Sequence, residues 1–269
     1  MSYDIGARLD LAKSLARKAG ALAVEMRKNQ DAAFSKEKSH QDFVTLADLA
    51  VESLIRREIA QAFPADSILG EEEGTTGGGE ALWVIDPIDG TTNYMRGLAD
   101  WGVSIAFCMR ERIELGVIYA PDIDTLIWAR VGEGAFVTHH GEEAIARVSD
   151  RSTLDNTLVQ LGRSARCKDY DYPALLKRVL DRGLEYRRNG SAAFSLLAVA
   201  LGRAEGFFES HLNPWDAMAG ILIVEEAGGT VDYPNFTGFI QKGGAVCASN
   251  TKLHDHIRAV IYSKPEMPV

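Results

Sequence analysis

The chain has 269 residues, of which 46% are hydrophobic, 25% charged and 8% aromatic, a composition typical of a folded globular protein. This apolar fraction excludes an intrinsically disordered chain. No apolar run reaches the roughly 18 residues that a membrane-spanning helix needs, so no such helix is expected. The formal net charge is −9, from 29 basic and 38 acidic residues. Such an acidic chain is poorly suited to bind nucleic-acid backbones, although bound metal ions would let it handle a small anion.

The N-terminal part of the chain predicts two helices. Apolar residues recur at alternating spacings of four and three between Ile5 and Met26, which predicts an amphipathic helix over 5–26. A second helix is predicted over 45–63, closed by Pro64. Because the N-terminal segment resembles no apolar signal sequence, we expect a cytoplasmic protein.

A series of strands should follow the two helices. The segment 67–70 leads into three glutamates, 75–80 is expected to be a mobile surface loop, and the strand 82–85 is expected to end at Asp86. Further strands are predicted at 102–109, 113–119, 125–129, 134–138, 157–161, 184–188, 205–209 and 245–249. The later ones alternate with helices at 171–182, 191–202, 216–227 and 250–261. This order predicts one compact α/β domain over 1–269, with sub-domains of about 1–147 and 148–269.

The three cysteines are Cys108, Cys167 and Cys247. Their number is odd, they lie far apart, and they form no Cys-x-x-Cys pair. We therefore expect buried free thiols rather than disulfides or a zinc site.

Two aspartates flank a proline immediately after the strand at 82–85. A proline-containing turn lets Asp86 and Asp89 converge, and two adjacent carboxylates would resist ionisation unless a hard cation such as Mg²⁺ held them. Gly90 allows close approach of the backbone, and Thr91 offers a hydroxyl beside amides that could face an anion. The alternative is an ordinary surface turn, for which Asp-Pro and Asp-Gly pairs are common.

Three further acids are candidates for the same site, and each has a simpler explanation. Glu71 leads a run of three glutamates that could be a solvated face. Asp216 would be favourable in a first helical turn because of the helix dipole alone. Asp48 fits a capping box with Thr45, which is compatible with a supporting role behind the site.

Several segments of the chain occur together in the order seen in one enzyme family. They are Asp42-x-Val44-Thr45-x-Ala47-Asp48, Gly70-Glu71-Glu72, residues 83–94 (Trp-Val-Ile-Asp-Pro-Ile-Asp-Gly-Thr-Thr-Asn-Tyr) and residues 215–220 with Glu225, Ala227, Gly228 and Gly229. In this order they resemble the inositol monophosphatase family over most of the chain. The ordered set is far more specific than any one motif.

The resemblance implies a five-layered αβαβα sandwich and Mg²⁺-dependent hydrolysis of a small phosphate monoester by in-line attack of a metal-activated water. It makes Glu71, Asp86 and the Ile88 carbonyl ligands of a first metal, and Asp86, Asp89 and Asp216 ligands of a second. Two or three Mg²⁺ ions would be bound in each active site. Glu71 and Thr91 would orient the water with Asp48 behind Thr91, and the amides of Gly90 and Thr91 would receive the phosphate.

The resemblance says less about the alcohol half of the substrate. Glu209 aligns with a family glutamate that holds a polyol hydroxyl, and Arg187 to Ala193 resembles the segment that lines the polyol, so Arg187 and Ala192 join Asp89 and Asp216 there. These residues favour myo-inositol monophosphate or a related sugar phosphate. Glu209 could equally be an exposed acid at a strand end, and Arg187 a surface cation.

Histidinol phosphate, fructose bisphosphate and a 3′-phosphonucleotide are alternative substrates for the same chemistry. A different class is a regulatory binding protein that keeps the fold. The only compact basic candidate for nucleic-acid contact in the second half is 163–168, which is expected to be a solvated loop and could equally approach the substrate or a partner subunit. No nucleic-acid or membrane partner is therefore expected. The resemblance implies a homodimer.

Overall fold

The computed structural model describes residues 4–29, 35–39, 42–164, 167 and 170–262, with the side chains of 35–39 and 42–44 excepted. The elements before residue 150 are α1 (Ile5–Lys28), β1 (Ser35–Ser39), β2 (Asp42–Thr45), α2 (Leu46–Ala62), β3 (Ser67–Gly70), β4 (Gly74–Thr76), β5 (Ala81–Asp89), α3 (Thr91–Met95), β6 (Gly102–Met109), β7 (Arg112–Ala120), the 3-10 turn η1 (Pro121–Ile123), β8 (Thr125–Arg130), β9 (Gly134–His139) and β10 (Glu142–Ile145). The later ones are β11 (Leu158–Leu161), α4 (Tyr172–Asp181), β12 (Glu185–Arg187), α5 (Ala192–Ala200), β13 (Gly206–Leu212), α6 (Pro214–Glu226), β14 (Gly229–Asp232), α7 (Phe236–Lys242), β15 (Gly244–Asn250) and α8 (His254–Tyr262).

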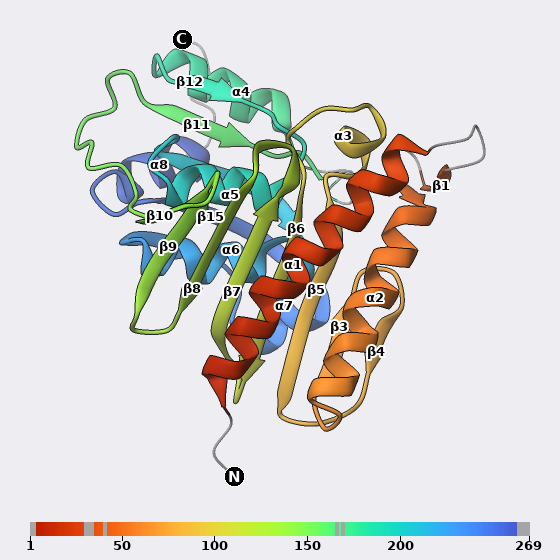
Figure 1. Ribbon diagram of the computed structural model, residues 1–269. Helices are drawn as coiled ribbons and strands as arrows, with labels where there is room; N and C mark the ends of the chain where they lie inside the picture. The colour runs from red at the N-terminus through yellow and green to blue at the C-terminus, as the bar shows by residue number, and fades with distance from the viewer. Residues whose placement is uncertain (1–3, 30–34, 40–41, 165–166, 168–169, 263–269) are drawn as a thin grey trace.

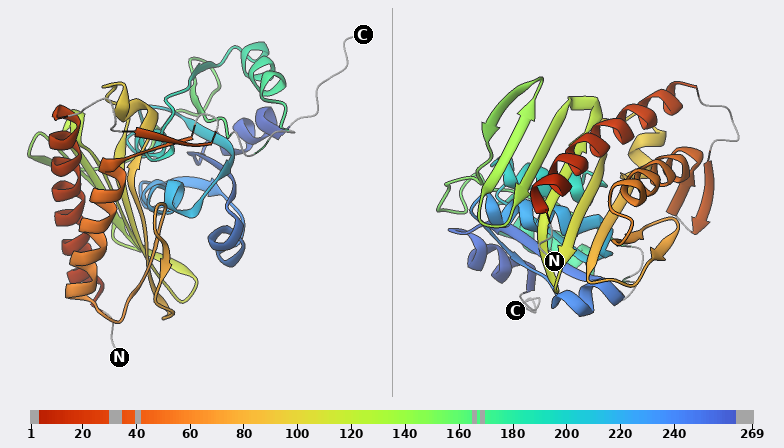
Figure 2. Two further views of the ribbon diagram at one scale, coloured as in Figure 1. Left: turned by 90° about the vertical axis from the view of Figure 1, so that its right-hand side faces the viewer. Right: turned by 60° about the horizontal axis from the view of Figure 1, so that its bottom comes forward.

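Two main sheets and three groups of helices alternate through the molecule (Figure 1), and β1 and β2 form a separate two-stranded antiparallel sheet. The larger sheet has the order β10-β9-β8-β7-β6-β5-β3-β4, and the smaller one β12-β11-β13-β15-β14. The helices α1 and α2 cover the outer face of the larger sheet, α5 and α6 lie between the sheets, and α4 and α8 cover the outer face of the smaller one (Figure 2). These are the five αβαβα layers that the resemblance implies.

The positions of the helices follow from their sequences. Asp4 accepts a hydrogen bond of 2.9 Å from the Ala7 amide and so begins α1, whose small apolar residues pack on the larger sheet. The helix α6 is apolar around most of its circumference, which suits an element that is covered from both sides. No described helix is both long and apolar enough to cross a membrane.

Several sequence-based expectations need correction. The strand β5 does not end at Ile85 but continues to Asp89, and part of the expected loop 75–80 pairs with β3 as the edge strand β4. All three cysteines are free as expected, but Cys167 is only partly buried. The elements β1, β2, α3, β10, β14 and α7 were not anticipated, because each is short and carries little periodic signal of its own.

Candidate active site

An irregularity in β5 brings its two aspartates to the same side of the sheet. Asp86 pairs with Ser104 of β6 and Asp89 pairs with Gly102, so one extra residue of β5 is accommodated between them. In a regular strand, side chains three positions apart point to opposite faces. The extra residue reverses this parity, and Pro87, which has no amide proton to donate, lies within the irregular segment.

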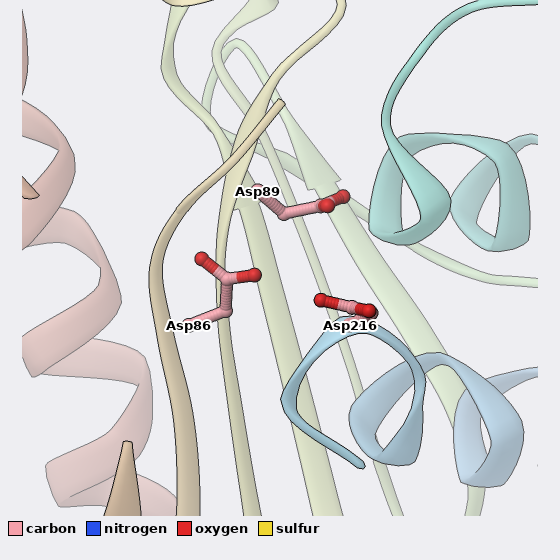
Figure 3. A group of neighbouring side chains, drawn as sticks. All are labelled: Asp86, Asp89 and Asp216. Atoms are coloured by element: carbon pink, nitrogen blue, oxygen red, sulfur yellow. The ribbon is translucent and has the colours of Figure 1, made fainter. Parts of the chain in front are cut away.

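Asp216 approaches the same point from the N-terminus of α6. Oxygen atoms of Asp86, Asp89 and Asp216 lie within 4.8 Å of one another, and we call these three residues the aspartate cluster (Figure 3). Asp216 also accepts a hydrogen bond of 2.7 Å from the Asn213 amide as part of a capping box. Asp216 therefore lies in the first turn of α6, where the helix dipole favours an acid, and the same residue also belongs to the cluster.

Two members of the cluster are buried while Asp216 is partly exposed, and burial raises the pKa values of the two buried carboxyl groups. Asp86 is 1% exposed and Asp89 is 8% exposed. Burial raises the pKa of Asp86 well above its usual value, and the charges of Glu71, Asp89, Asp216 and Asp48 raise it further. Burial and the Asp216 charge raise the pKa of Asp89 to about 7, against the lowering effect of hydrogen bonds from Ser191 and neighbouring amides.

The chemistry of this cluster fits a hard divalent cation. Its members offer only carboxylate oxygens, the donors that Mg²⁺ prefers. Within the described part of the chain, neither Asp86 nor Asp89 forms an ion pair with a lysine, arginine or histidine. A bound cation would therefore favour the ionised forms that burial disfavours.

The N-terminus of α5 holds Asp89 in place. The Ser191 hydroxyl and the Ala193 amide donate hydrogen bonds of 2.5 Å and 2.6 Å to the same Asp89 oxygen. Ala192, expected to line the substrate, begins α5 between these two donors. Ser191 was not singled out from the sequence, although its position before an apolar helix is an N-cap signal.

Thr91 and Asp48 meet beside β5 as expected. The Thr91 hydroxyl lies 3.2 Å from an Asp48 carboxylate oxygen and 3.2 Å from the Ile88 carbonyl oxygen. The other Asp48 oxygen accepts a hydrogen bond of 2.8 Å from the Thr45 amide, so the capping box at α2 forms as well. Burial raises the pKa of Asp48 to about 6, although the hydrogen bonds from Thr45 lower it.

Gly90 has a backbone conformation that favours glycine. Its φ is +94°, and a Cβ atom would lie 3.0 Å from the Ser191 Cβ and 3.1 Å from the Asp100 carbonyl oxygen. A side chain here would be strained and crowded. The turn into α3 therefore depends on glycine at this position.

Glu71 lies outside the aspartate cluster but close to it. It leads a turn formed by residues 71–73, which we call the acidic turn, and it is half-buried whereas Glu73 is exposed. Among the neighbouring charges, that of Glu71 raises the pKa of Asp86 the most. Glu73 is therefore the member of the run that fits a solvated face.

Two of the residues expected at the alcohol side, Glu209 and Arg187, have different surroundings. Glu209 of β13 lies over the backbone of Gly162, where a Cβ atom would come within 1.8 Å of its Oε2. The Arg187 guanidinium instead lies 3.4 Å from Glu185 and donates a hydrogen bond of 2.8 Å to the Tyr186 carbonyl, both on β12. Among the described residues Arg187 makes no contact with the aspartate cluster, so its surroundings here are those of a surface cation.

Comparisons with known proteins agree with this arrangement. The profile of the Inositol monophosphatase family matches residues 7–266. The Nus factor SuhB of Escherichia coli is 39% identical over 234 residues, which are 86% of this chain and 85% of that protein.

Solved structures are similar over nearly the whole chain. The extragenic suppressor protein suhB of Bartonella henselae is 32% identical with a TM-score of 0.89, and the match covers 96% of this chain and 100% of that one. An inositol monophosphatase from Anabaena is also 32% identical, with a TM-score of 0.83 and 98% of both chains covered. The chain belongs to the inositol monophosphatase family.

Proposed function

We propose that the protein is an Mg²⁺-dependent phosphomonoesterase that hydrolyses myo-inositol monophosphate or a related sugar phosphate. The observation that carries this proposal is the aspartate cluster, whose carboxylate oxygens lie within 4.8 Å of one another. Membership of the family supports the reaction class. The substrate rests on the likeness of Glu209 and its surroundings to the family pattern.

Two overlapping sets of residues would hold the metal ions. Glu71, Asp86 and the Ile88 carbonyl would hold one ion, and Asp86, Asp89 and Asp216 would hold another. When bound, the ions lower the pKa of the attacking water and stabilise the leaving oxygen. The chain then has to position its reactants, because phosphoryl transfer needs alignment and charge neutralisation more than covalent catalysis.

Thr91 is suited to orient the attacking water. Above about pH 6 the Asp48 carboxylate is ionised and can accept a hydrogen bond from the Thr91 hydroxyl, which lies 3.2 Å away. The lone pairs of the Thr91 oxygen are then available to accept a hydrogen bond from water. Glu71 would hold the same water from the side of the acidic turn.

The remaining residues would bind the two halves of the substrate. The amides of Gly90 and Thr91 would face the phosphate, and Asp89, Ala192, Glu209 and Asp216 would line the alcohol. Arg187 would contribute only after leaving Glu185, since it now lies 3.4 Å from that carboxylate.

Phosphate release from a panel of substrates tests the proposal. The panel contains myo-inositol 1-phosphate, glucose and galactose 1-phosphates, histidinol phosphate, fructose 1,6-bisphosphate and adenosine 3′,5′-bisphosphate, each with Mg²⁺ and with a chelator. Mg²⁺-dependent turnover led by inositol or sugar phosphates is expected. Turnover led by histidinol phosphate or the nucleotide would contradict the substrate assignment, and no turnover would contradict the reaction.

A second candidate function comes from the names of the relatives. The Escherichia coli protein with 39% identity is named a Nus factor, so a regulatory role on the same fold is the alternative. A role independent of hydrolysis predicts that the wild-type chain and its Asp89→Asn variant both complement loss of that relative. Complementation by the wild type alone would favour the phosphatase.

We further propose that the protein forms a homodimer in the cytoplasm. Its partner would be a small phosphate monoester, with no nucleic-acid or membrane partner. Light scattering on the purified protein tests the dimer. A mass of one chain in solution would contradict it.

A further inference from the structure

Glu52 is a buried carboxylate outside every motif considered above. It lies on α2 and is 0% exposed. Its Oε2 accepts a hydrogen bond of 2.8 Å from the Glu72 amide, and its Oε1 accepts one of 2.9 Å from the Glu73 amide. One carboxylate from a distant helix therefore binds the backbone of the acidic turn at two successive residues.

Arg56 extends these contacts to the other side of the turn. Its Nε lies 2.8 Å from Glu52 Oε1, one helical turn away on α2. Its two terminal nitrogens donate hydrogen bonds of 2.5 Å to the Gly74 carbonyl and 3.2 Å to the Thr76 hydroxyl. The Glu52–Arg56 pair thus contacts both the acidic turn and the strand β4 that follows it.

Gly70 lets this pair approach the residue before Glu71. A Cβ atom at Gly70 would lie 2.3 Å from Glu52 Oε1 and 2.8 Å from an Arg56 nitrogen. The backbone on both sides of Glu71 therefore rests on the Glu52–Arg56 pair: Gly70 by close packing, and Glu72 by a hydrogen bond.

Stability alone gives a weak reason for such a pair. Burying two charges costs much of what their attraction returns, and apolar residues of similar size often serve a protein equally well. Two apolar side chains could not, however, satisfy the amides of Glu72 and Glu73. What the charged pair adds is a fixed backbone conformation at the acidic turn.

We propose that Glu52 and Arg56 are positioning residues that fix the backbone of the acidic turn and thereby aim the Glu71 carboxylate at Asp86. The inference rests on the proposed metal role of Glu71. The contacts on either side of Glu71, at Gly70 and at the Glu72 amide, support it.

Direct titration with Mg²⁺ by calorimetry, without substrate, tests the inference. Glu52→Gln replaces one of the two accepting carboxylate oxygens by an NH2 group, which is a donor and cannot accept a hydrogen bond from a turn amide. Glu52→Asp keeps the charge opposite Arg56 but shortens its reach. We expect both to weaken Mg²⁺ binding by about 10- to 100-fold, as changes behind metal ligands commonly do. The matched control is Glu58→Gln on the same helix, which pairs with Lys18 at 3.0 Å and should bind Mg²⁺ like the wild type.

A double-mutant cycle separates positioning from a merely structural role. If Glu52 acts through Glu71, Glu52→Asp should leave Mg²⁺ binding unchanged in a Glu71→Gln background, whereas independent effects would add. Wild-type affinity in the folded Glu52→Asp variant, or additive losses, would overturn the inference. Absence of Mg²⁺ binding to the wild-type protein would instead overturn the proposed function, and this inference with it.

Discussion

The Ser191 hydroxyl donates a hydrogen bond of 2.5 Å to the Asp89 carboxylate, although the two residues are 102 positions apart. Asp89 ends β5 of the larger sheet, and Ser191 is the N-cap of α5 between the sheets. The side-chain amide of Asn93 makes a second connection of this kind. Its Nδ2 donates hydrogen bonds of 2.6 Å to the Asp100 carbonyl and 2.7 Å to the Asn189 carbonyl. The candidate site is therefore held together between the larger sheet and the helices that lie between the two main sheets.

Ser191→Ala should separate the two tasks of this serine. Its hydroxyl also accepts a hydrogen bond from the Phe194 amide as the N-cap of α5, so the free energy of unfolding should fall by about 1 kcal/mol. Losing the contact to Asp89 should lower Mg²⁺-dependent activity by about tenfold. Thermal unfolding and steady-state rates measure both effects. Ser195→Ala is the control in the same helix, and an equal loss of activity there would refute the role of Ser191.

The metal-free protein should become less stable as the pH rises towards neutrality. Burial raises the pKa of Asp89 from 3.8 to about 7, so in this interval the folded state keeps a proton that the unfolded state has lost. Unfolding is then favoured as protons are withdrawn, and the contribution levels off above the folded-state pKa. Mg²⁺ binds the ionised form, so the stabilisation it provides should grow over the same interval.

Melting temperatures at a series of pH values, with Mg²⁺ and with a chelator, check this dependence. In Asp89→Asn, which cannot titrate, the metal-free profile should be flatter. A wild-type metal-free profile that rises between about pH 5 and 7 with the same slope as that of the variant would contradict the assignment.

Gly162→Ala should impair substrate binding and leave Mg²⁺ binding unchanged. A Cβ atom at this position would lie 1.8 Å from Glu209 Oε2, so the carboxylate has to move. If Glu209 holds a hydroxyl of the alcohol, losing a hydrogen bond to a charged group costs about 1.5 kcal/mol or more, or roughly tenfold in KM. Michaelis constants for myo-inositol 1-phosphate measure this. An unchanged KM together with unchanged Mg²⁺ binding would show that Glu209 lies outside the substrate site.

The elements with strong periodicity could be predicted from the sequence. The spacing of apolar residues placed the first helix at 5–26, against the observed Ile5–Lys28. The strands from Gly102 to His139 were predicted within two residues, because β-branched and aromatic runs alternate there with turn residues.

Elements and contacts that depend on distant parts of the chain were missed. The irregularity in β5 is defined only by its pairing with β6. The edge strand β4 is held by Arg56, which lies 18 residues before Gly74. Ser191, Glu52 and Arg56 carry no local signal of a site, because each acts on a segment far away in the sequence.

In the candidate site, too, residues within sequence motifs could be predicted, and contacts between side chains could not. The motifs named Asp86, Asp89 and Asp216, and these three come together in the fold. Thr91 meets Asp48 as expected. Arg187 was named from a segment likeness, but its neighbour Glu185 competes for the guanidinium, and a pattern of residues does not reveal such competition.

Phosphate release from myo-inositol 1-phosphate during a Mg²⁺ titration, with wild type and Asp89→Asn side by side, tests the central claim most directly. The substitution removes a carboxylate charge at nearly constant volume. The account predicts no release without Mg²⁺, saturable release by the wild type, and loss of release by the folded variant at every Mg²⁺ concentration. Near-normal turnover of Asp89→Asn at saturating Mg²⁺, or wild-type turnover in a chelator, would contradict it.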